Sequence, residues 1–229
     1  MDKATSKLLD EAFDLFKQGK YDEAIPRFKR ILEVAERSIG PNDPVIALSL
    51  DYLAGIYQEQ GKYDEAIPLL KRALEIAERS LGSNNPEVAT NLRKVASLCL
   101  RIGDYDEAIS LFERSLEIDE RALGPDHPDM ANNLNNLAGL YFEQDKYEKA
   151  IPLFKRSLAI LERTVGPIHP DVAAVLNNLA RTYYEQGRYD DALSTYQRAV
   201  SIAEAALGPN HPNTKVFKEA LKACQDAMS

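Results

Sequence analysis

The sequence repeats every 42 residues over nearly its whole length, with no insertion or deletion between repeats. One tyrosine, one glycine and one proline mark every period: Tyr21, Tyr63, Tyr105, Tyr147 and Tyr189; Gly40, Gly82, Gly124, Gly166 and Gly208; Pro44, Pro86, Pro128, Pro170 and Pro212. Such self-similarity is the signature of a repeat array, whose units each bury their apolar surface against neighbouring units.

Each unit contains two amphipathic segments. In the fourth unit, Leu134, Leu137, Ala138 and Tyr141 follow the i, i+3, i+4, i+7 spacing of one helical face. After a short turn, a second stripe with the same period contains Tyr147, Ala150, Ile151, Phe154, Leu158 and Leu161. Two helices joined by so short a turn pack antiparallel, and one pair cannot cover both stripes, so neighbouring pairs must stack.

The sequence therefore predicts an all-α fold, an α-solenoid of antiparallel helix pairs that forms one domain over residues 1–229. The predicted units are 2–43, 44–85, 86–127, 128–169 and 170–211, followed by a capping helix at 212–227. The eleven predicted helices are 2–18, 21–39, 44–60, 63–81, 86–102, 105–123, 128–144, 147–165, 170–186, 189–207 and 212–227.

Proline and glycine predict the helix ends. The period-marking prolines fall at the first helical position, where a missing N–H costs nothing. The period-marking glycines are expected to end the second helix of each pair in the left-handed conformation. Pro26, Pro68 and Pro152 fall near the start of a second helix, where a lost donor is tolerated.

Composition narrows the classes of function. The chain of 229 residues has 28 Lys and Arg against 36 Asp and Glu, which disfavours a nucleic-acid binder. The first residues mix acidic with apolar side chains, so no signal peptide is expected, and no run approaches the ~18 apolar residues of a membrane span. Cys99 and Cys224 are expected to be core thiols in a reducing compartment, which predicts a cytoplasmic location.

No pattern in the sequence indicates catalysis. It has no Gly-rich phosphate loop, no Gly-x-Ser-x-Gly elbow and no Cys-x-x-Cys pair, so we expect neither an enzyme nor a cofactor. His127, His169 and His211 each precede a helix-starting proline, at a position that Asp43 and Asn85 take in other units. This interchange indicates helix N-caps rather than metal ligands.

The Leu-x-x-Leu-Ala-x-x-Tyr stripe, followed by Gly-x-Tyr-x-x-Ala, resembles the tetratricopeptide repeat. The residues at that family's signature positions are Leu137, Ala138, Tyr141, Tyr147, Ala150, Phe154 and Ser157. The 42-residue unit is longer than the family's usual one, and its LNNLA, YEKAIPLFKRSLAI and GPxHPDV segments are similar to the cargo-binding repeats of kinesin light chains. The resemblance implies a right-handed superhelix. The chain lacks the sustained heptads of the coiled coil in a kinesin light chain, so it is either a cargo-type array alone or an unrelated adaptor built from the same repeat. The regularity of the units favours the second, a stand-alone array of the bacterial type.

The resemblance also implies that peptides bind in a concave groove lined by the first helix of each pair. The expected peptide-binding residues are Asp51, Tyr52, Arg93, Lys94, Arg101, Asn132, Asn135, Asn136, Asn177, Asn178 and Arg181. The expected apolar part of the groove contains Leu9, Phe13, Phe16 and Leu48. Cations can hold carboxylates, and asparagine amides match the donors and acceptors of an extended backbone.

Two functional hypotheses follow. The first is a non-enzymatic adaptor that binds an extended, acidic segment of a partner protein carrying a bulky apolar residue. In the second, the array is a structural element that self-associates through Phe13 and Phe16. An alternative for the groove cations also stays open, because they can pair with Asp51, Glu59 or Glu143 on neighbouring helices, which contributes only ~0 to 1 kcal/mol per exposed pair.

Overall fold

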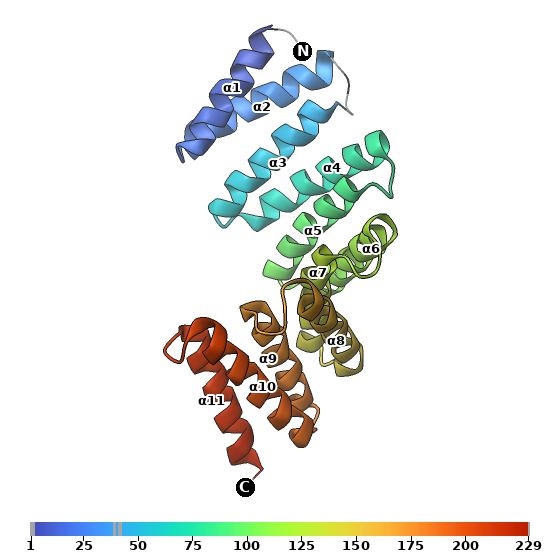
Figure 1. Cartoon of the computed structure of the whole chain (residues 1–229). Helices are drawn as coiled ribbons and strands as arrows, with labels where there is room; N and C mark the ends of the chain where they lie inside the picture. The colour runs from blue at the N-terminus through green and yellow to red at the C-terminus, as the bar shows by residue number, and fades with distance from the viewer. Residues whose placement is uncertain (1–2, 39, 41–42, 229) are drawn as a thin grey trace. The chain divides into compact units, whose positions relative to one another are not determined.

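The computed structural model describes residues 3–38, 40 and 43–228. These residues form eleven helices and no strand, which confirms the all-α prediction (Figure 1). The helices are α1 Lys3–Lys17, α2 Tyr21–Ser38, α3 Pro44–Glu59, α4 Tyr63–Leu81, α5 Pro86–Arg101, α6 Tyr105–Leu123, α7 Pro128–Glu143, α8 Tyr147–Thr164, α9 Pro170–Glu185, α10 Tyr189–Leu207 and α11 Pro212–Ala227.

Most predicted helix ends agree with the structure to within one residue. The predicted ends at 18, 60, 102, 144, 165 and 186 each fall one residue too late. Gln60 shows the reason: its N–H still donates to the carbonyl of Ile56, but the residue is the C-cap that closes the turn. The predicted start at residue 2 and end at residue 39 lie outside the described residues.

Each odd-numbered helix from α3 onward begins with a proline and is capped by the residue before it. The side chain of Asp43 accepts a hydrogen bond from the Val45 N–H at 2.9 Å, and Asn85 does the same for Glu87. In the later units the Nδ1 atoms of His127, His169 and His211 accept from the backbone N–H two residues on, at 3.2 to 3.3 Å. The N-cap role predicted for these histidines is confirmed.

The turns between helices depend on positive φ angles. Gly82 and Gly208, which end α4 and α10, have φ values of 87° and 90° but ψ values of 146° and 159°. The predicted left-handed conformation is therefore wrong in ψ at these two ends, although the positive φ still requires glycine. The turns inside each pair also carry a residue with positive φ: Gly19, Gly61, Gly103, Asp145 and Gly187.

Pro26, Pro68 and Pro152 lie at the sixth residue of α2, α4 and α8. The three helices begin where the sequence predicts, so each proline lies near the helix start as expected, and it removes one intrahelical donor. All three side chains are exposed, and solvent can satisfy the carbonyl that loses its partner.

The chain divides into two compact units, Met1–Ile118 and Asp119–Ser229, with the boundary inside α6. Helices adjacent in sequence pack against each other from α1 to α5 in the first unit and from α7 to α11 in the second. The first core contains Phe28, Ile31 and Leu50, and the second contains Met130 and Phe154, all at most 1% exposed. That the two units form one continuous array stays a prediction.

A series of Arg–Glu ion pairs joins the second helices of adjacent repeats. The pairs are Glu36–Arg72, Glu78–Arg114, Glu120–Arg156 and Glu162–Arg198. The nitrogen–oxygen distance is 2.5 Å in the second of these pairs and 3.0 Å in the third. We call this series the Arg–Glu ladder; it contributes at most ~1 kcal/mol per pair because its members are partly exposed.

Candidate functional site

The first unit contains a groove between α3 and α5 that is formed by two cavities. One cavity, of about 300 Å³, is lined by Phe16, Leu48, Asp51, Tyr52, Gly55 and Lys94. The other, of about 420 Å³, is lined by Gln58, Glu59, Gly61, Tyr63, Ser97, Leu98 and Arg101. We call these two cavities together the α3–α5 groove. They bring four of the predicted binding residues together: Asp51, Tyr52, Lys94 and Arg101.

Lys94 is held by a residue on the neighbouring first helix. Its Nζ atom donates a hydrogen bond of 2.6 Å to Oδ2 of Asp51, with 42% of the lysine side chain and 28% of the aspartate side chain exposed. The alternative pairing of Lys94 with Asp51 is thus the arrangement in the structure. A carboxylate arriving from a partner must share this ammonium group with Asp51.

The other two cations of α5 are arranged differently. Arg101 places its guanidinium over the ring of Tyr63, 4.9 Å from the centroid. A guanidinium that contacts a ring through its face can still bind a carboxylate through its in-plane N–H groups. Arg93 donates from Nη2 to the hydroxyl of Thr90 at 3.0 Å and is not a lining residue of either cavity.

The predicted apolar residues pack mainly against each other. Phe13 and Phe16 lie 4.6 and 5.0 Å from the ring of Tyr52, which also stacks on Phe28 at 5.4 Å. Leu9 is 9% exposed and belongs to the core, so it offers a ligand little surface. Leu48, at 40% exposed, is the member of this predicted set with the most accessible surface.

The predicted amide residues lie in the second unit. Asn178 on α9 donates from Nδ2 to Oδ1 of Asn135 on α7 at 3.2 Å, and Asn177 keeps a buried Oδ1 with no hydrogen-bond partner. Asn132 and Asn136 are exposed on α7. Arg181 stacks over Phe142, 4.3 Å from its centroid. These first helices therefore present polar groups, but no described cavity gathers them.

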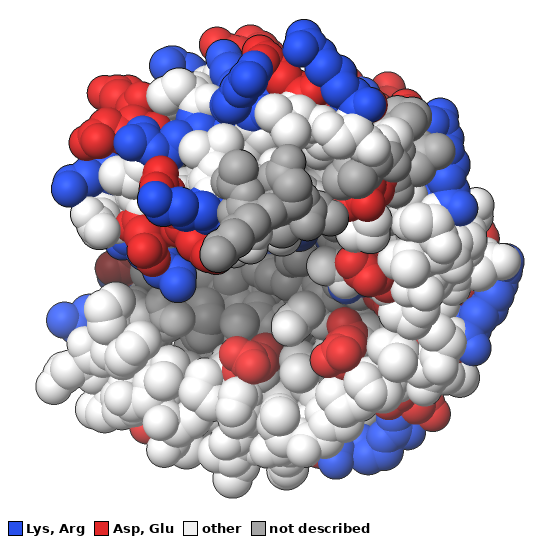
Figure 2. Space-filling model, turned by 90° about the horizontal axis from the view of Figure 1, so that it is seen from above, with Lys and Arg blue, Asp and Glu red and all other residues white. Residues whose placement is uncertain are grey.

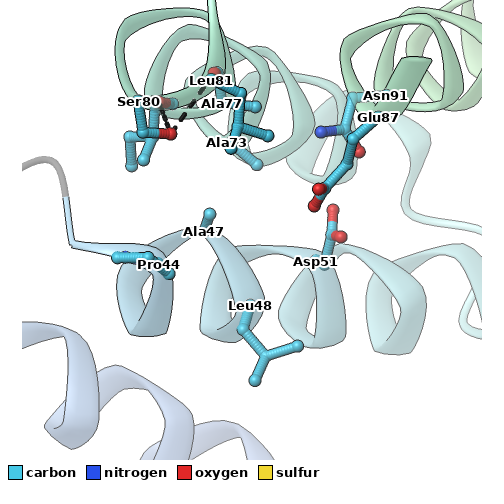
Figure 3. Close-up of a pocket in the computed structure, with 11 residues that line it drawn as sticks. Pro44, Ala47, Leu48, Asp51, Ala73, Ala77, Ser80, Leu81, Glu87 and Asn91 are labelled. Carbon is cyan, nitrogen blue, oxygen red and sulfur yellow. Dashed lines mark hydrogen bonds between the residues drawn. The ribbon is translucent and has the colours of Figure 1, made fainter. Parts of the chain in front are cut away.

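A third cavity, of about 380 Å³, lies between α3, α4 and α5 (Figure 3). Two of its polar lining residues, Glu87 and Asn91, are not among the predicted binding residues, because neither lies on the helix face expected to line the groove. A signal was available in the repeat register. Ala77 stands where the next unit has Asp119, the hydrogen-bond partner of the buried Asn133.

Charges of both signs are distributed over the surface. On the face that Figure 2 shows, Lys and Arg side chains lie among Asp and Glu side chains, with uncharged surface between them. In the part of the chain that the structure describes, no cluster of three or more His, Cys, Asp and Glu residues could hold a metal ion. Within the same residues, no helix combines the length and hydropathy needed to cross a bilayer.

Cys99 lies beside an ion pair in the first unit. Lys71 and Glu107 are 2.5 Å apart, and the Cys99 thiol donates to Oε2 of Glu107 at 3.5 Å. Burial, reinforced by the negative charge of Glu107, raises the pKa of Cys99 to about 11. Cys224 is also a free, buried thiol with a pKa raised by burial. The prediction that both cysteines are core residues is confirmed.

Comparison with known families decides the classification. Two tetratricopeptide repeat models match the chain, one over residues 4–79, 45–121 and 87–163 and the other over residues 172–213. This chain belongs to the tetratricopeptide repeat family. The resemblance inferred from the 42-residue unit is therefore confirmed. No curated protein sequence gives a significant match.

Solved structures share the fold of this tetratricopeptide repeat protein. The kinesin light chain-type repeats of Podospora anserina superpose with a TM-score of 0.74 at 23% identity, covering 90% of this chain and 98% of that one. BtubC (BKLC) from P. vanneervenii gives 0.71 at 23% identity, with 99% and 85% covered. MamA gives 0.68 at 19% identity, with 89% and 94% covered.

Tetratricopeptide repeat proteins generally mediate protein–protein interactions and act as non-enzymatic scaffolds. In this tetratricopeptide repeat protein, α1, α3 and α5 supply most of the groove side chains, and Tyr63 of α4 adds one more. The N-caps and prolines fix where α3 and α5 begin. Lys94 and Arg101 are consequently held on one side of α5, next to two cavities.

Proposed function

We propose that this protein is a non-enzymatic adaptor that binds an extended, acidic segment of a partner protein in the α3–α5 groove. The observation that carries the proposal is that Lys94 and Arg101, both on α5, each line a cavity. Asp51, Tyr52 and Leu48 line the first cavity and supply polar and apolar contacts beside the cations.

The spacing of Lys94 and Arg101 suggests which spacing of carboxylates the groove recognises in the partner segment. Lys94 and Arg101 are two helical turns apart, which is about 10 Å along the axis of α5. About three residues of an extended chain in the polyproline II conformation span this length, and its period of three places side chains i and i+3 on the same side. We therefore propose that the partner segment carries carboxylates at positions i and i+3, one for each cation.

The remaining predicted residues lie in the second unit, and we propose a peptide contact for that unit by itself. Its polar residues would contact the backbone of an extended peptide through their amide and guanidinium groups; they are Asn132, Asn135, Asn136, Asn177, Asn178 and Arg181. We also propose a cytoplasmic location, which is supported by the two cysteines being free thiols in the core. The partner in this proposal is a protein rather than a nucleic acid, in keeping with the net charge of −8.

The test uses extended peptide libraries with two fixed positions, i and i+3, and all other positions randomised. One library has glutamate at both fixed positions, and the other has glutamine, which keeps the shape and removes the charge. We expect the protein to retain the glutamate library preferentially and the Lys94→Glu/Arg101→Glu variant to lose this preference. Equal retention of the two libraries by the unaltered protein would overturn the proposal.

A control variant changes the net charge by the same amount as Lys94→Glu/Arg101→Glu but at residues outside the groove. Lys29 and Arg37 are exposed on α2 and line neither cavity, so Lys29→Glu/Arg37→Glu changes the charge equally without touching the groove. This control is expected to keep the glutamate preference. Circular dichroism of each variant checks that the helices remain folded, and Arg101→Gln gives a second test without charge reversal.

A further inference from the structure

The cavity between α3, α4 and α5 has a wall of small apolar side chains. Ala47 of α3 faces Ala73 and Ala77 of α4 across a space of about 380 Å³ (Figure 3). This volume lies in the range of pockets that hold small ligands. Leu81, which is 43% exposed, stands at the edge of the cavity with Ser80, whose hydroxyl is bonded to the carbonyl of Ile76.

The cavity lies where this repeat combines a small side chain, Ala77, with an asparagine, Asn91. Alanine also stands at the position of Ala77 in the first and last repeats, as Ala35 and Ala203, but Ser49 and Phe217 take the place of the asparagine there. In the next repeat, the position of Ala77 is taken by Asp119, which accepts a 2.9 Å hydrogen bond from the buried amide of Asn133. One repeat further on, Leu161 and Val175 fill the corresponding positions and are both buried. Ala77 lacks the carboxylate of Asp119 and is smaller than Leu161. The space in front of the Asn91 amide therefore stays open.

Asn91 is therefore a buried amide directed into an open cavity. It is 8% exposed, and within the described residues it forms no side-chain hydrogen bond. Asp51 adds a buried Oδ1 atom that has no hydrogen-bond partner. Buried polar atoms without partners are costly, so the partnerless Oδ1 of Asp51 beside the Asn91 amide indicates that a ligand donor binds here.

The charges around the cavity favour a cation. Figure 3 shows the Glu87 and Asp51 side chains pointing toward each other at the end where Asn91 lies. Lys94, bonded to Asp51, compensates for one of these two carboxylates, which leaves one net negative charge at the polar end. A positively charged group placed there would be attracted by the remaining carboxylate and by the partnerless Oδ1 of Asp51.

We propose that this cavity receives a lysine or arginine side chain of the bound segment. The aliphatic stem would pack on Ala47, Ala73 and Ala77, and the cationic head would meet Asp51, Glu87 and Asn91. This inference rests on the proposed function and adds to it: the segment carries one basic residue besides the acidic pair. Leu48 and Asp51 line both this cavity and the groove, so one segment can reach both.

The experiment uses small probes that need no groove contact. N-acetyl-lysine methylamide and N-acetyl-arginine methylamide are titrated into the ¹⁵N-labelled full chain, beside the uncharged Nε-acetylated lysine analogue. Saturable shifts of the Ala77, Ser80 and Asn91 amides are expected with the two cationic probes and not with the uncharged one. Absence of saturable shifts at these residues, or equal shifts with the uncharged analogue, would overturn the proposal.

Two variants test separately the negative charge of Glu87 and the open volume of the cavity. Glu87→Gln removes one carboxylate and is expected to weaken binding of the lysine probe about fivefold, the equivalent of about 1 kcal/mol. Ala77→Leu/Asn91→Val places the buried Leu161–Val175 pair of a later repeat in this position and is expected to abolish binding. Unchanged affinity in both variants would contradict the assignment.

A control carries the same loss of charge elsewhere on α4. Glu75 is exposed and does not line the cavity, so Glu75→Gln should bind the lysine probe as the unaltered protein does. Failure of the two proposals is distinguishable. Probe binding tests the cavity alone, whereas retention of the glutamate library tests the acidic segment in the α3–α5 groove.

Discussion

At the residue scale, Cys99 is the side chain whose chemistry the fold changes most clearly. The thiol is fully buried on α5 and its pKa is raised to about 11, first by burial and then by Glu107. Since the thiolate is the reactive form, the folded protein should react slowly with thiol reagents at about pH 8. We expect both cysteines to be modified quickly only in denaturant, measured as the absorbance change with Ellman's reagent. Fast modification of the native protein would contradict this.

The same shift has a consequence for stability at alkaline pH. The folded-state pKa lies above that of an unfolded thiol, which is about 8.5. The contribution of Cys99 to the free energy of unfolding is therefore complete below about pH 8.5 and is lost as the pH rises toward about 11. Urea denaturation should show a steeper decline over this interval for the unaltered protein than for Cys99→Ala. Identical slopes would count against the shifted pKa.

The sequence predicted least well which side chains of the site contact each other. The sequence placed Lys94 and Asp51 on one face but left open whether Lys94 meets a ligand or a neighbouring acid, since the two are 43 residues apart. Their pairing depends on how α3 and α5 pack. Phe13 and Phe16 were open in the same way, because packing on Tyr52 and Phe28 cannot be deduced from helical spacing alone.

At the scale of elements, the sequence predicted nearly every helix because each end carries its own local signal. The proline that starts α7, with His127 as its N-cap, needs no tertiary contact to be recognised. The conformations of the turns were predicted less well, since glycine indicates a positive φ without fixing ψ.

The N-cap of α7 offers a direct test. His127 accepts from the Asp129 N–H at 3.3 Å through Nδ1, whereas the equivalent Asp43 accepts at 2.9 Å with a charged carboxylate. Replacement of His127 by aspartate should raise the free energy of unfolding by about 0.5 kcal/mol, because a negative charge is favourable at a helix N-terminus. Replacement by alanine should lower it by about 1 kcal/mol. Chemical denaturation measures both, and the opposite order would disprove the capping role.

Two glycines give a matched comparison of helix and turn. Gly139 lies inside α7 and a Cβ added there would meet nothing within 4 Å, so Gly139→Ala should stabilise the protein by about 0.5 to 1 kcal/mol. Gly103, with φ +81° between α5 and α6, also has open space around it. Gly103→Ala should nevertheless destabilise by about 1 kcal/mol, because its backbone conformation is strained for alanine. Thermal unfolding of both variants reveals whether the signs differ as expected.

At the scale of the whole molecule, the aromatic side chains of the first unit bear on self-association. Phe13, Phe16 and Tyr52 are half-buried and packed on one another, so they offer little surface for a second copy. We expect a sedimentation coefficient that does not change with protein concentration in analytical ultracentrifugation. A coefficient that rises with concentration, and rises less in Phe16→Ser, would instead support the self-associating alternative.

The Arg–Glu ladder has a consequence for how such a chain can change in length. Every rung joins a glutamate to the arginine 36 residues later, and the spacing is the same in both compact units. Deletion of the 42 residues 86–127 would bring Arg156 to the place that Arg114 now occupies, opposite Glu78. Duplication of the same stretch would insert one more matched rung. Unequal crossing-over between gene segments that encode single repeats could therefore shorten or lengthen this protein without leaving a glutamate or an arginine of the ladder unmatched at the new junction.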